Sequence, residues 1–264
     1  MLIRDPVLII VAHGTQRSGA LPGEVFQGRL QQLLPHFEVR LAFLHNSPDI
    51  QAVLEDVLKN QPADILLFPL LFSQSIDTVN LLSPTTGNIE GSRAQILPAA
   101  GCLPGFGRML THRAVDSTLP LNGKVRNPAV FLVSHGRKSD RKPARNFLEI
   151  RNAVARSLGH DEVYNVQLEG CFPLDQWRER TQNRKAVFIP LMAGDGFHCR
   201  VDIPAAVDMR PDENLRILSP VGTWWELSVL LAEYVNLRWL DGGSEYSGPI
   251  SRKLTRTCRC LVEK

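Results

Sequence analysis

The chain has 264 residues, of which 44% are hydrophobic and 22% charged, as is ordinary for a globular protein. Its 30 basic and 27 acidic residues leave a net charge of only +3, which is too small to indicate nucleic-acid binding. No apolar run reaches the ~18 residues that span a bilayer, no signal-peptide pattern opens the chain, and the five cysteines are too scattered for a disulfide framework. We therefore expect a cytoplasmic protein with no membrane partner.

Strands and helices alternate along the first half of the chain. The strands are predicted from continuous apolar runs, and the helices from apolar residues that recur with helical spacing. The predicted strands lie near 7–12, 38–44, 64–72 and 94–98, and the predicted helices near 24–34, 49–60 and 102–115. Strands that are apolar throughout are typical of parallel sheets covered by helices on both faces.

The second half has the same alternation. Its predicted strands lie near 129–134, 163–168, 185–192 and 215–219, and its predicted helices near 143–158, 174–182, 201–209 and 223–240. The two halves also share landmarks in the same order, and His135 follows His13 at an offset of 122 residues. The paired landmarks are His13-Gly14 with His135-Gly136, Pro69 with Pro190, Pro98 with Pro220, and Gly101 with Gly222.

This internal repeat predicts the architecture. We expect an α/β protein of two similar modules in tandem, residues 1–122 and 126–243, each with a mostly four-stranded parallel sheet flanked by helices. Residues 244–264 break the pattern and are predicted to be a mobile tail. Ligands of parallel sheets bind beyond the carboxyl ends of the strands, so we expect the site in the crevice between the modules.

Three polar side chains stand at successive strand ends of the second module. His135, Glu169 and His198 follow its first, second and third predicted strands, and should therefore face the same crevice. Two imidazoles and a carboxylate can bind a divalent first-row metal, and they can also accept protons from a substrate. Gly136 permits a tight turn or a close approach of the backbone to a ligand.

The motifs that contain these residues are similar to those of a known family. They read Ser134-His135-Gly136-Arg137, then Gln167-Leu168-Glu169, then Pro190-Leu191-Met192, then Gly196-Phe197-His198-Cys199-Arg200-Val201-Asp202-Ile203-Pro204. In this pattern the chain resembles the single-subunit class II tetrapyrrole chelatases, specifically the CbiX-like sirohydrochlorin chelatases, which include ferrochelatases and cobaltochelatases. The resemblance covers both modules, and the last motif is its most specific part.

The resemblance implies a chelatase-like fold and the insertion of a divalent metal ion into sirohydrochlorin, towards siroheme with iron or cobalamin with cobalt. It implies that His135 and His198 bind the metal and that Glu169, a further metal ligand, helps to remove the pyrrole protons. It implies no organic cofactor, since Fe2+ or Co2+ is a substrate. The absence of a His-rich metal-storage tract favours iron.

The two modules differ at these positions. His13 matches His135, but His45 replaces the acid, and Asp77 stands near the position of the second histidine. We therefore predict that the second module carries the active site. The first has a degenerate site, whose His13 and His45 are candidates for a second wall of the crevice.

A basic segment follows His135. Five of the nine residues from Arg137 to Arg145 are lysine or arginine, although the first turn of a helix prefers acidic residues. Sirohydrochlorin has many carboxylates, which a basic rim would bind. The predicted substrate-binding residues are Gly136, Arg137, Lys138, Arg141 and Arg200.

Other functions stay open at this point. A noncatalytic tetrapyrrole or metal carrier would have the same motifs. A phosphate or nucleotide enzyme is disfavoured, because neither a Gly-x-x-x-x-Gly-Lys nor a Gly-x-Gly-x-x-Gly motif follows a strand. Two fused modules make a monomer feasible and leave a homodimer open. Cys258 and Cys260 in the tail either pass metal to the site or are inert.

Overall fold

The structure is a computed structural model. It describes residues 5–14, 23–60, 62, 64–73, 93–117, 128–139, 141–142, 144–181, 185–210 and 214–240. The junction between the two predicted modules and the predicted tail over 244–264 lie outside the described residues, so the division into residues 1–122 and 126–243 stays a prediction. No helix among the described residues is both long and apolar enough to cross a membrane.

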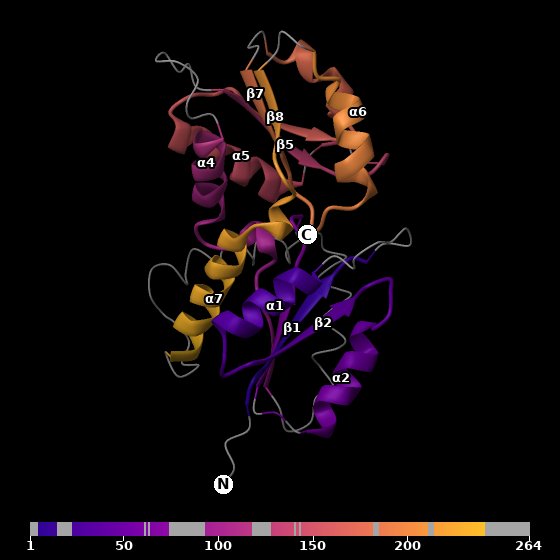
Figure 1. The fold of residues 1–264 in the computed structure, drawn as a ribbon, viewed down its shortest axis with the longest axis vertical. Helices are drawn as coiled ribbons and strands as arrows, with labels where there is room; N and C mark the ends of the chain where they lie inside the picture. Colours follow the sequence, from indigo (N-terminus) through magenta and orange to yellow (C-terminus); the bar gives the residue numbers. More distant parts are fainter. Residues whose placement is uncertain are drawn as a thin grey trace.

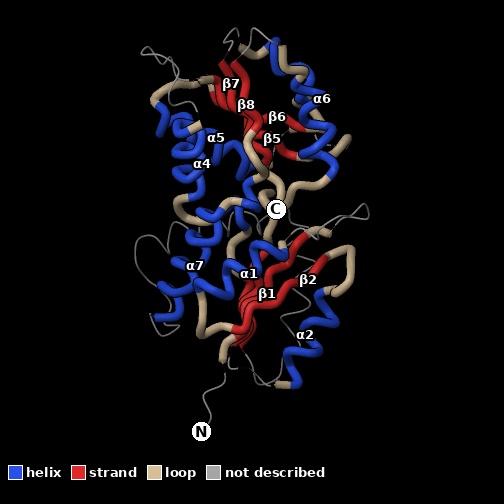
Figure 2. The backbone as a smooth tube through the Cα atoms, in the orientation of Figure 1, coloured by secondary structure: helices blue, strands red, loops and turns tan. Residues whose placement is uncertain are grey.

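Two parallel sheets form the centres of two lobes (Figures 1 and 2). The first has the strand order β2-β1-β3-β4 and the second the order β6-β5-β7-β8, and every pairing is parallel. The strands are β1 (Val7–Ala12), β2 (Glu38–Phe43), β3 (Asp64–Pro69), β4 (Arg93–Ile96), β5 (Ala129–Ser134), β6 (Val163–Gln167), β7 (Lys185–Pro190) and β8 (Asn214–Ile217). The fold class predicted from the repeat is thereby confirmed.

The central strands form where the sequence is apolar throughout. Every residue of β1, β3 and β5 is buried, because helices cover both faces of each sheet. The α-helices are α1 (Glu24–Leu33), α2 (Ile50–Lys59), α4 (Phe106–Asp116), α5 (Arg145–Leu158), α6 (Ile203–Val207) and α7 (Trp225–Leu240). Short helices are η1 (Ala100–Cys102), η2 (Leu174–Glu179), η3 (His198–Asp202) and η4 (Val221–Thr223).

Two helix predictions were wrong in part. Instead of an α-helix over 174–182, η2 is a 3₁₀-helix whose Gln176 is not helical. It holds the Trp177 ring in the core, where the indole Nε1–H donates to the Val207 carbonyl at 3.1 Å. Instead of one helix over 201–209, the π-helix η3 begins at His198 and continues directly into α6, which ends at Val207.

The last helix of each half packs on the other lobe. Helix α4 ends the first half but lies against α5 and β7 of the second lobe, and α7 ends the second half but lies against α1 of the first (Figure 1). The two exchanged helices also contact each other, and the Arg113 guanidinium on α4 forms an ion pair with Glu226 on α7 at 3.2 Å. Each lobe is therefore completed by a helix from the other repeat.

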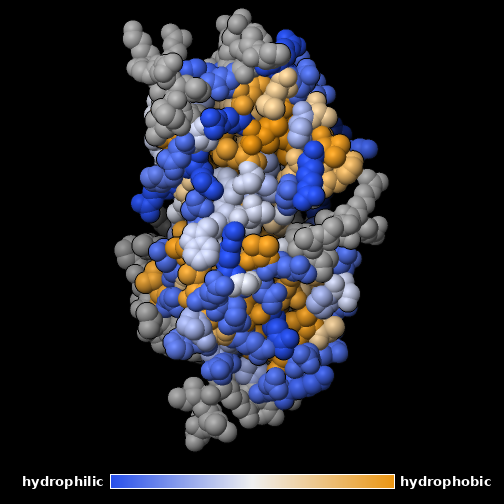
Figure 3. Space-filling model, viewed as in Figure 1, coloured by the Kyte–Doolittle hydropathy of each residue, from blue (hydrophilic) through white to orange (hydrophobic). Residues whose placement is uncertain are grey.

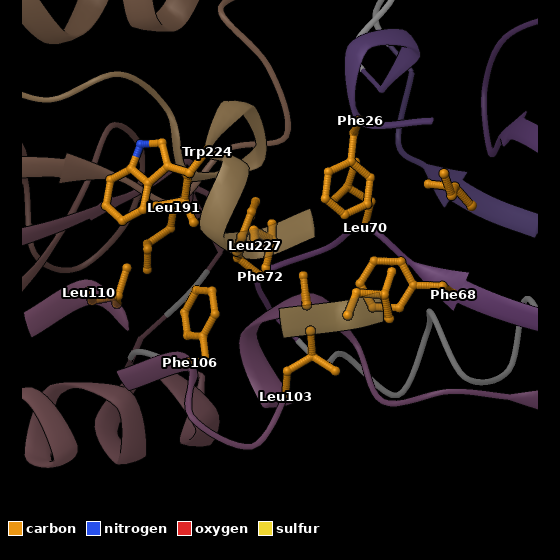
Figure 4. Packing of buried hydrophobic residues seen from close by; sticks show 14 of the residues in the cluster. Phe26, Phe68, Leu70, Phe72, Leu103, Phe106, Leu110, Leu191, Trp224 and Leu227 are labelled. Atoms are coloured by element: carbon orange, nitrogen blue, oxygen red, sulfur yellow. The ribbon is translucent and has the colours of Figure 1, made fainter. Parts of the chain in front are cut away.

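One hydrophobic core is continuous between the lobes. Figure 4 shows Trp224 and Leu227 of the second repeat in the same cluster as Phe72, Leu103 and Phe106 of the first, and all five are buried. Burial of apolar side chains is the main favourable term in folding. The contact between the lobes therefore contributes to the stability of the whole chain.

The carboxyl ends of both sheets face the boundary between the lobes. After β4 the chain enters η1, which packs on α5 of the second lobe, and after β8 it enters η4, which packs on α1 of the first. Because all strands of each sheet are parallel, every strand of each sheet ends at this same edge. Residues that directly follow β1, β2, β5, β6 and β7 are thus placed on the two sides of the boundary.

Candidate active site

The ends of β5 and β6 bring His135 and Glu169 together. The parallel ladder continues past both strands, as Leu168 N–H donates to the Ser134 carbonyl at 3.0 Å and Glu169 N–H to the His135 carbonyl at 2.8 Å. His135 is exposed and Glu169 is half-buried. The sequence predicted that these strand ends would meet, and the backbone hydrogen bonds fix them as neighbours.

Gly136 forms the turn after His135. Its φ of +71° is in the left-handed region, and a Cβ there would collide with the Glu169 carbonyl oxygen and with the Gln167 side chain. The turn directs the Gly136 carbonyl at the imidazole, whose Nδ1 lies 2.8 Å away. A carbonyl can only accept, so Nδ1 carries the proton and Nε2 has its lone pair available.

His198 opens the π-helix η3. In this wide turn the Ile203 N–H donates to the His198 carbonyl, five residues back, and π turns are frequent at functional sites. The His198 Nδ1 lies 2.6 Å from an Asp202 carboxylate oxygen. That carboxylate accepts from Nδ1 and so leaves the lone pair on Nε2, as in the carboxylate–histidine pairs that orient metal ligands.

Asp202 was not predicted to be a site residue. The signal was present, since Asp202 lies four residues after His198 and side chains at this spacing are neighbours in a helical turn. The predicted helix began near residue 201, so His198 and Asp202 were not expected to share a helical turn.

The rings of His135 and His198 lie next to each other. Their centroids are 4.6 Å apart with an interplanar angle of 73°, although 63 residues separate them in sequence. The His198 side chain is 45% exposed, so a small ion can reach it. Two fixed and accessible imidazoles with free Nε2 lone pairs can bind a divalent first-row metal.

No group of three His, Cys, Asp or Glu side chains in the described ranges is arranged to hold a metal ion. The structure thus brings together the two imidazoles but does not include the Glu169 carboxylate in a three-ligand group. The role of Glu169 as a metal ligand stays a prediction.

The basic segment lies at the start of α5. Arg137, Lys138 and Arg141 are exposed, and α5 begins at Arg145 with no acidic residue in its first turn and no side-chain cap. Arg200 is also exposed, and its guanidinium pairs with Asp195 at 3.0 Å. These cations follow His135 or His198 closely in sequence, and their role in binding a substrate stays a prediction.

Apolar surface gathers over the second lobe around α6 (Figure 3). Phe197 and Val201, on either side of His198, are each 46% exposed, and Met209 is 57% exposed. The Phe197 ring centroid lies 6.4 Å from that of His198. These apolar neighbours of the histidine were not predicted, since their exposure depends on the η3 turn.

Three of the cysteines lie within the described residues, and they differ in burial. Cys102 and Cys171 are half-buried, not fully buried. Cys199 is buried beside Met192, and burial, reinforced by the Asp195 carboxylate, raises the pKa of its thiol to about 12. It is therefore a neutral thiol at physiological pH and a poor metal ligand. Cys258 and Cys260 lie outside the described residues.

The first lobe holds a second histidine pair. The ring centroids of His13 and His45 lie 4.7 Å apart with an interplanar angle of 64°. As in the second lobe, the strand-end histidine is followed by a glycine with positive φ, Gly14, whose carbonyl lies 3.1 Å from His13 Nδ1. The predicted position of Asp77 lies outside the described residues.

Comparisons with known proteins agree with this architecture. The family model CbiX matches residues 7–96 and 129–236, one segment in each half. No curated protein sequence matches the chain.

Three solved structures share the fold. The structure of CbiX, the terminal enzyme for biosynthesis of siroheme in denitrifying bacteria, is 22% identical with a TM-score of 0.67, over 87% of this chain and 98% of that one. SirB from Bacillus subtilis with Fe3+ is 18% identical with a TM-score of 0.67, over 88% and 94%. The sirohydrochlorin chelatase SirB from Bacillus subtilis subspecies spizizenii in complex with cobalt is 16% identical with a TM-score of 0.63, over 88% and 94%.

Proposed function

Because the chain belongs to the CbiX family, we propose that it is a sirohydrochlorin chelatase, which inserts Fe2+ into sirohydrochlorin to give siroheme. The observation that carries the proposal is the pair of imidazoles of His135 and His198, 4.6 Å apart, each with its Nδ1 occupied by an acceptor from the protein. The resulting free Nε2 atoms suit a metal that must be bound and then released. Insertion of Co2+, towards cobalamin, is the alternative.

The proposed reaction exchanges one divalent ion for two protons at the centre of the macrocycle. His135 and His198 hold the incoming ion through Nε2, and a site with few protein ligands lets the metal leave for the pyrrole nitrogens. Of the two pyrrole protons, one passes to the Glu169 side chain as general base, and the other passes to an imidazole that the ion has left. The backbone hydrogen bond between Glu169 and His135 keeps the proton acceptor beside the metal ligand.

The surroundings of the histidines fit a flat, polyanionic substrate. Phe197 and Val201 offer apolar surface to the face of the macrocycle. The exposed cations Arg137, Lys138 and Arg141, with Gly136 at the turn, would bind its carboxylate arms. Arg200 would join them by exchanging Asp195 for a substrate carboxylate.

Replacing Arg137 and Arg141 together with alanine should raise the KM for sirohydrochlorin more than it lowers kcat. Each charge-assisted hydrogen bond to a carboxylate contributes about 1.5–3 kcal/mol, so the additive loss of two such bonds should raise KM by at least about a hundredfold. Initial rates at several sirohydrochlorin concentrations measure it. Arg151 and Arg156, also in the α5 region, serve as the matched double control. A fall in kcat with an unchanged KM would contradict the binding role.

Replacing Asp202 with asparagine should raise the KM for the metal by about tenfold or more, because the amide no longer favours the tautomer of His198 that has its lone pair on Nε2. Asp202→Glu should restore part of the affinity, which a merely structural role would not predict. Metal titrations at fixed sirohydrochlorin measure the effect, with Asp175→Asn, an exposed acid of the same lobe, as control. An unchanged KM for metal would remove Asp202 from the site.

The experiment that tests the function is absorption spectroscopy of anaerobic sirohydrochlorin with Fe2+ or Co2+. Metallation should be faster with the protein than without it, and the ratio of the two metal rates identifies the preferred ion. Binding of the macrocycle without acceleration for either ion would overturn the proposal in favour of a noncatalytic carrier.

A further inference from the structure

We propose that His13 and His45 form a second binding site for a divalent first-row metal ion, in the first lobe and separate from the pair His135 and His198. The inference goes beyond the proposed reaction, since it concerns binding of the metal alone and needs no tetrapyrrole.

The backbone of the first sheet positions this pair. β1 and β2 are paired in register up to Ala12 and Phe43, and the Leu44 N–H donates to the Ala12 carbonyl at 3.0 Å. The ladder thus continues past both strands and places His13 beside His45. Their ring centroids are 4.7 Å apart, close to the 4.6 Å of His135 and His198.

The tautomer of His13 suits a metal ligand. Its Nδ1 lies 3.1 Å from the Gly14 carbonyl, which can only accept, so the proton is on Nδ1 and Nε2 has its lone pair free. Gly14 has a φ of +81°, in the left-handed region, and this turn brings the Gly14 carbonyl to the imidazole of His13. Gly136 does the same for His135. Both His13 and His45 are exposed, so an ion can enter without any movement of the core.

The two histidine pairs follow different strands in the two lobes. In the second lobe the two histidines follow β5 and β7, and the acid Glu169 follows β6. In the first lobe the second histidine follows β2, at the position that corresponds to Glu169. The two imidazoles are therefore built from different strand ends, although their spacing is nearly the same. In each lobe the histidine after the first strand, His13 or His135, also has the carbonyl of the following glycine at its Nδ1.

Two neutral imidazoles favour borderline divalent ions such as Co2+, Ni2+ and Zn2+ over Mg2+ and Ca2+. With water at the remaining positions such a site binds reversibly. Because the carboxyl ends of both sheets face the boundary between the lobes, the bound ion would lie at the same boundary as the pair His135 and His198.

The test is anaerobic equilibrium dialysis of the full chain against Co2+ without any tetrapyrrole, with the bound cobalt measured by mass spectrometry. His13→Gln, His45→Gln should lose about one equivalent of cobalt relative to the wild type, and His135→Gln, His198→Gln about one other equivalent. The fourfold variant should lose both. His36→Gln, His112→Gln, which changes two exposed histidines that are not paired, should lose none.

A second measurement does not depend on the folding of a variant. Paramagnetic Co2+ should broaden the imidazole signals of His13 and His45 in the wild-type chain, which has only seven histidines to resolve. Unchanged cobalt binding in the His13, His45 variant, together with sharp signals of these two rings, would overturn the inference. Neither result depends on whether the protein metallates sirohydrochlorin.

Discussion

Replacing both His135 and His198 with alanine should lower the rate of metal insertion into sirohydrochlorin by at least about a hundredfold. The variant loses both proposed metal ligands and, with them, an imidazole that accepts a pyrrole proton, a role that contributes about 10²–10⁴-fold. The Gly136 carbonyl and the Asp202 carboxylate bind Nδ1 of these histidines and leave each Nε2 available for the metal, and the variant loses both Nε2 atoms. The decay of the metal-free absorption band under anaerobic conditions gives the rate. The fold should be kept, because His135 is exposed and His198 is partly so.

Two further variants make this result specific. His36→Ala, His112→Ala removes two exposed histidines away from both pairs and should leave the rate within about twofold, as surface substitutions usually do. His13→Ala, His45→Ala tests the first lobe. If that variant lost the insertion rate while the His135, His198 variant kept it, the chemistry would have to be assigned to the first lobe.

Replacing Gly222 with alanine should lower the free energy of unfolding by about 3 kcal/mol or more, in the exceptional range for single substitutions. A Cβ at Gly222 would collide with the carbonyl group and Cα of Ala193, which are backbone atoms and cannot turn away. The Gly222 N–H donates to the Met192 carbonyl at 2.9 Å, so the clash would also break this contact. Urea denaturation of wild type and variant measures the loss.

The matched control is Gly28→Ala. Gly28 is an exposed residue of α1, and a Cβ there meets nothing within 4 Å. Alanine should stabilise the helix by up to about 1 kcal/mol. A loss at Gly222 no larger than about 0.5 kcal/mol would mean that the loop before His198 can shift without cost. Gly101, which meets the Phe72 carbonyl in the first lobe, should respond as Gly222 does.

Much of this architecture could be predicted from the sequence because its strands are unusually uniform. β1 and β5 are buried at every position, so their sequences are apolar without interruption and stand out as strands. The repeat then supplied the order of the elements. The same reasoning brought His135 and Glu169 together, since parallel strands end at one edge.

The η3 turn could not be predicted in this way. A π-helix is defined by hydrogen bonds between residues five apart, and no residue pattern specifies this spacing. As a result the helical segment begins at His198, three residues before the predicted start at 201. The contact between His198 and Asp202 and the exposure of Phe197 both follow from that shift. The exposed cations of the basic segment were predicted as a group, but their contacts with a substrate lie beyond what the sequence or the described side chains specify.

The exchange of α4 and α7 was also hidden from the sequence. The amphipathic pattern of a helix says that one face is buried, but not which lobe buries it. The order of the elements along the chain assigned α4 to the first module, whereas Gly107 lies so close to Ala153 of α5 that a Cβ would have to displace it. Small residues at a helix contact are informative only once the partner is known.

The exchange of α4 and α7 has a consequence for how the chain unfolds. Two domains joined by a simple linker can melt one after the other, each with its own midpoint. Here the opening of the first lobe would release α7 and with it Trp224, while the opening of the second would release α4 and Phe106 from the shared core. The last helix of each repeat is covered by the opposite lobe, so we expect the chain to unfold cooperatively, and a substitution in either repeat should lower one common midpoint.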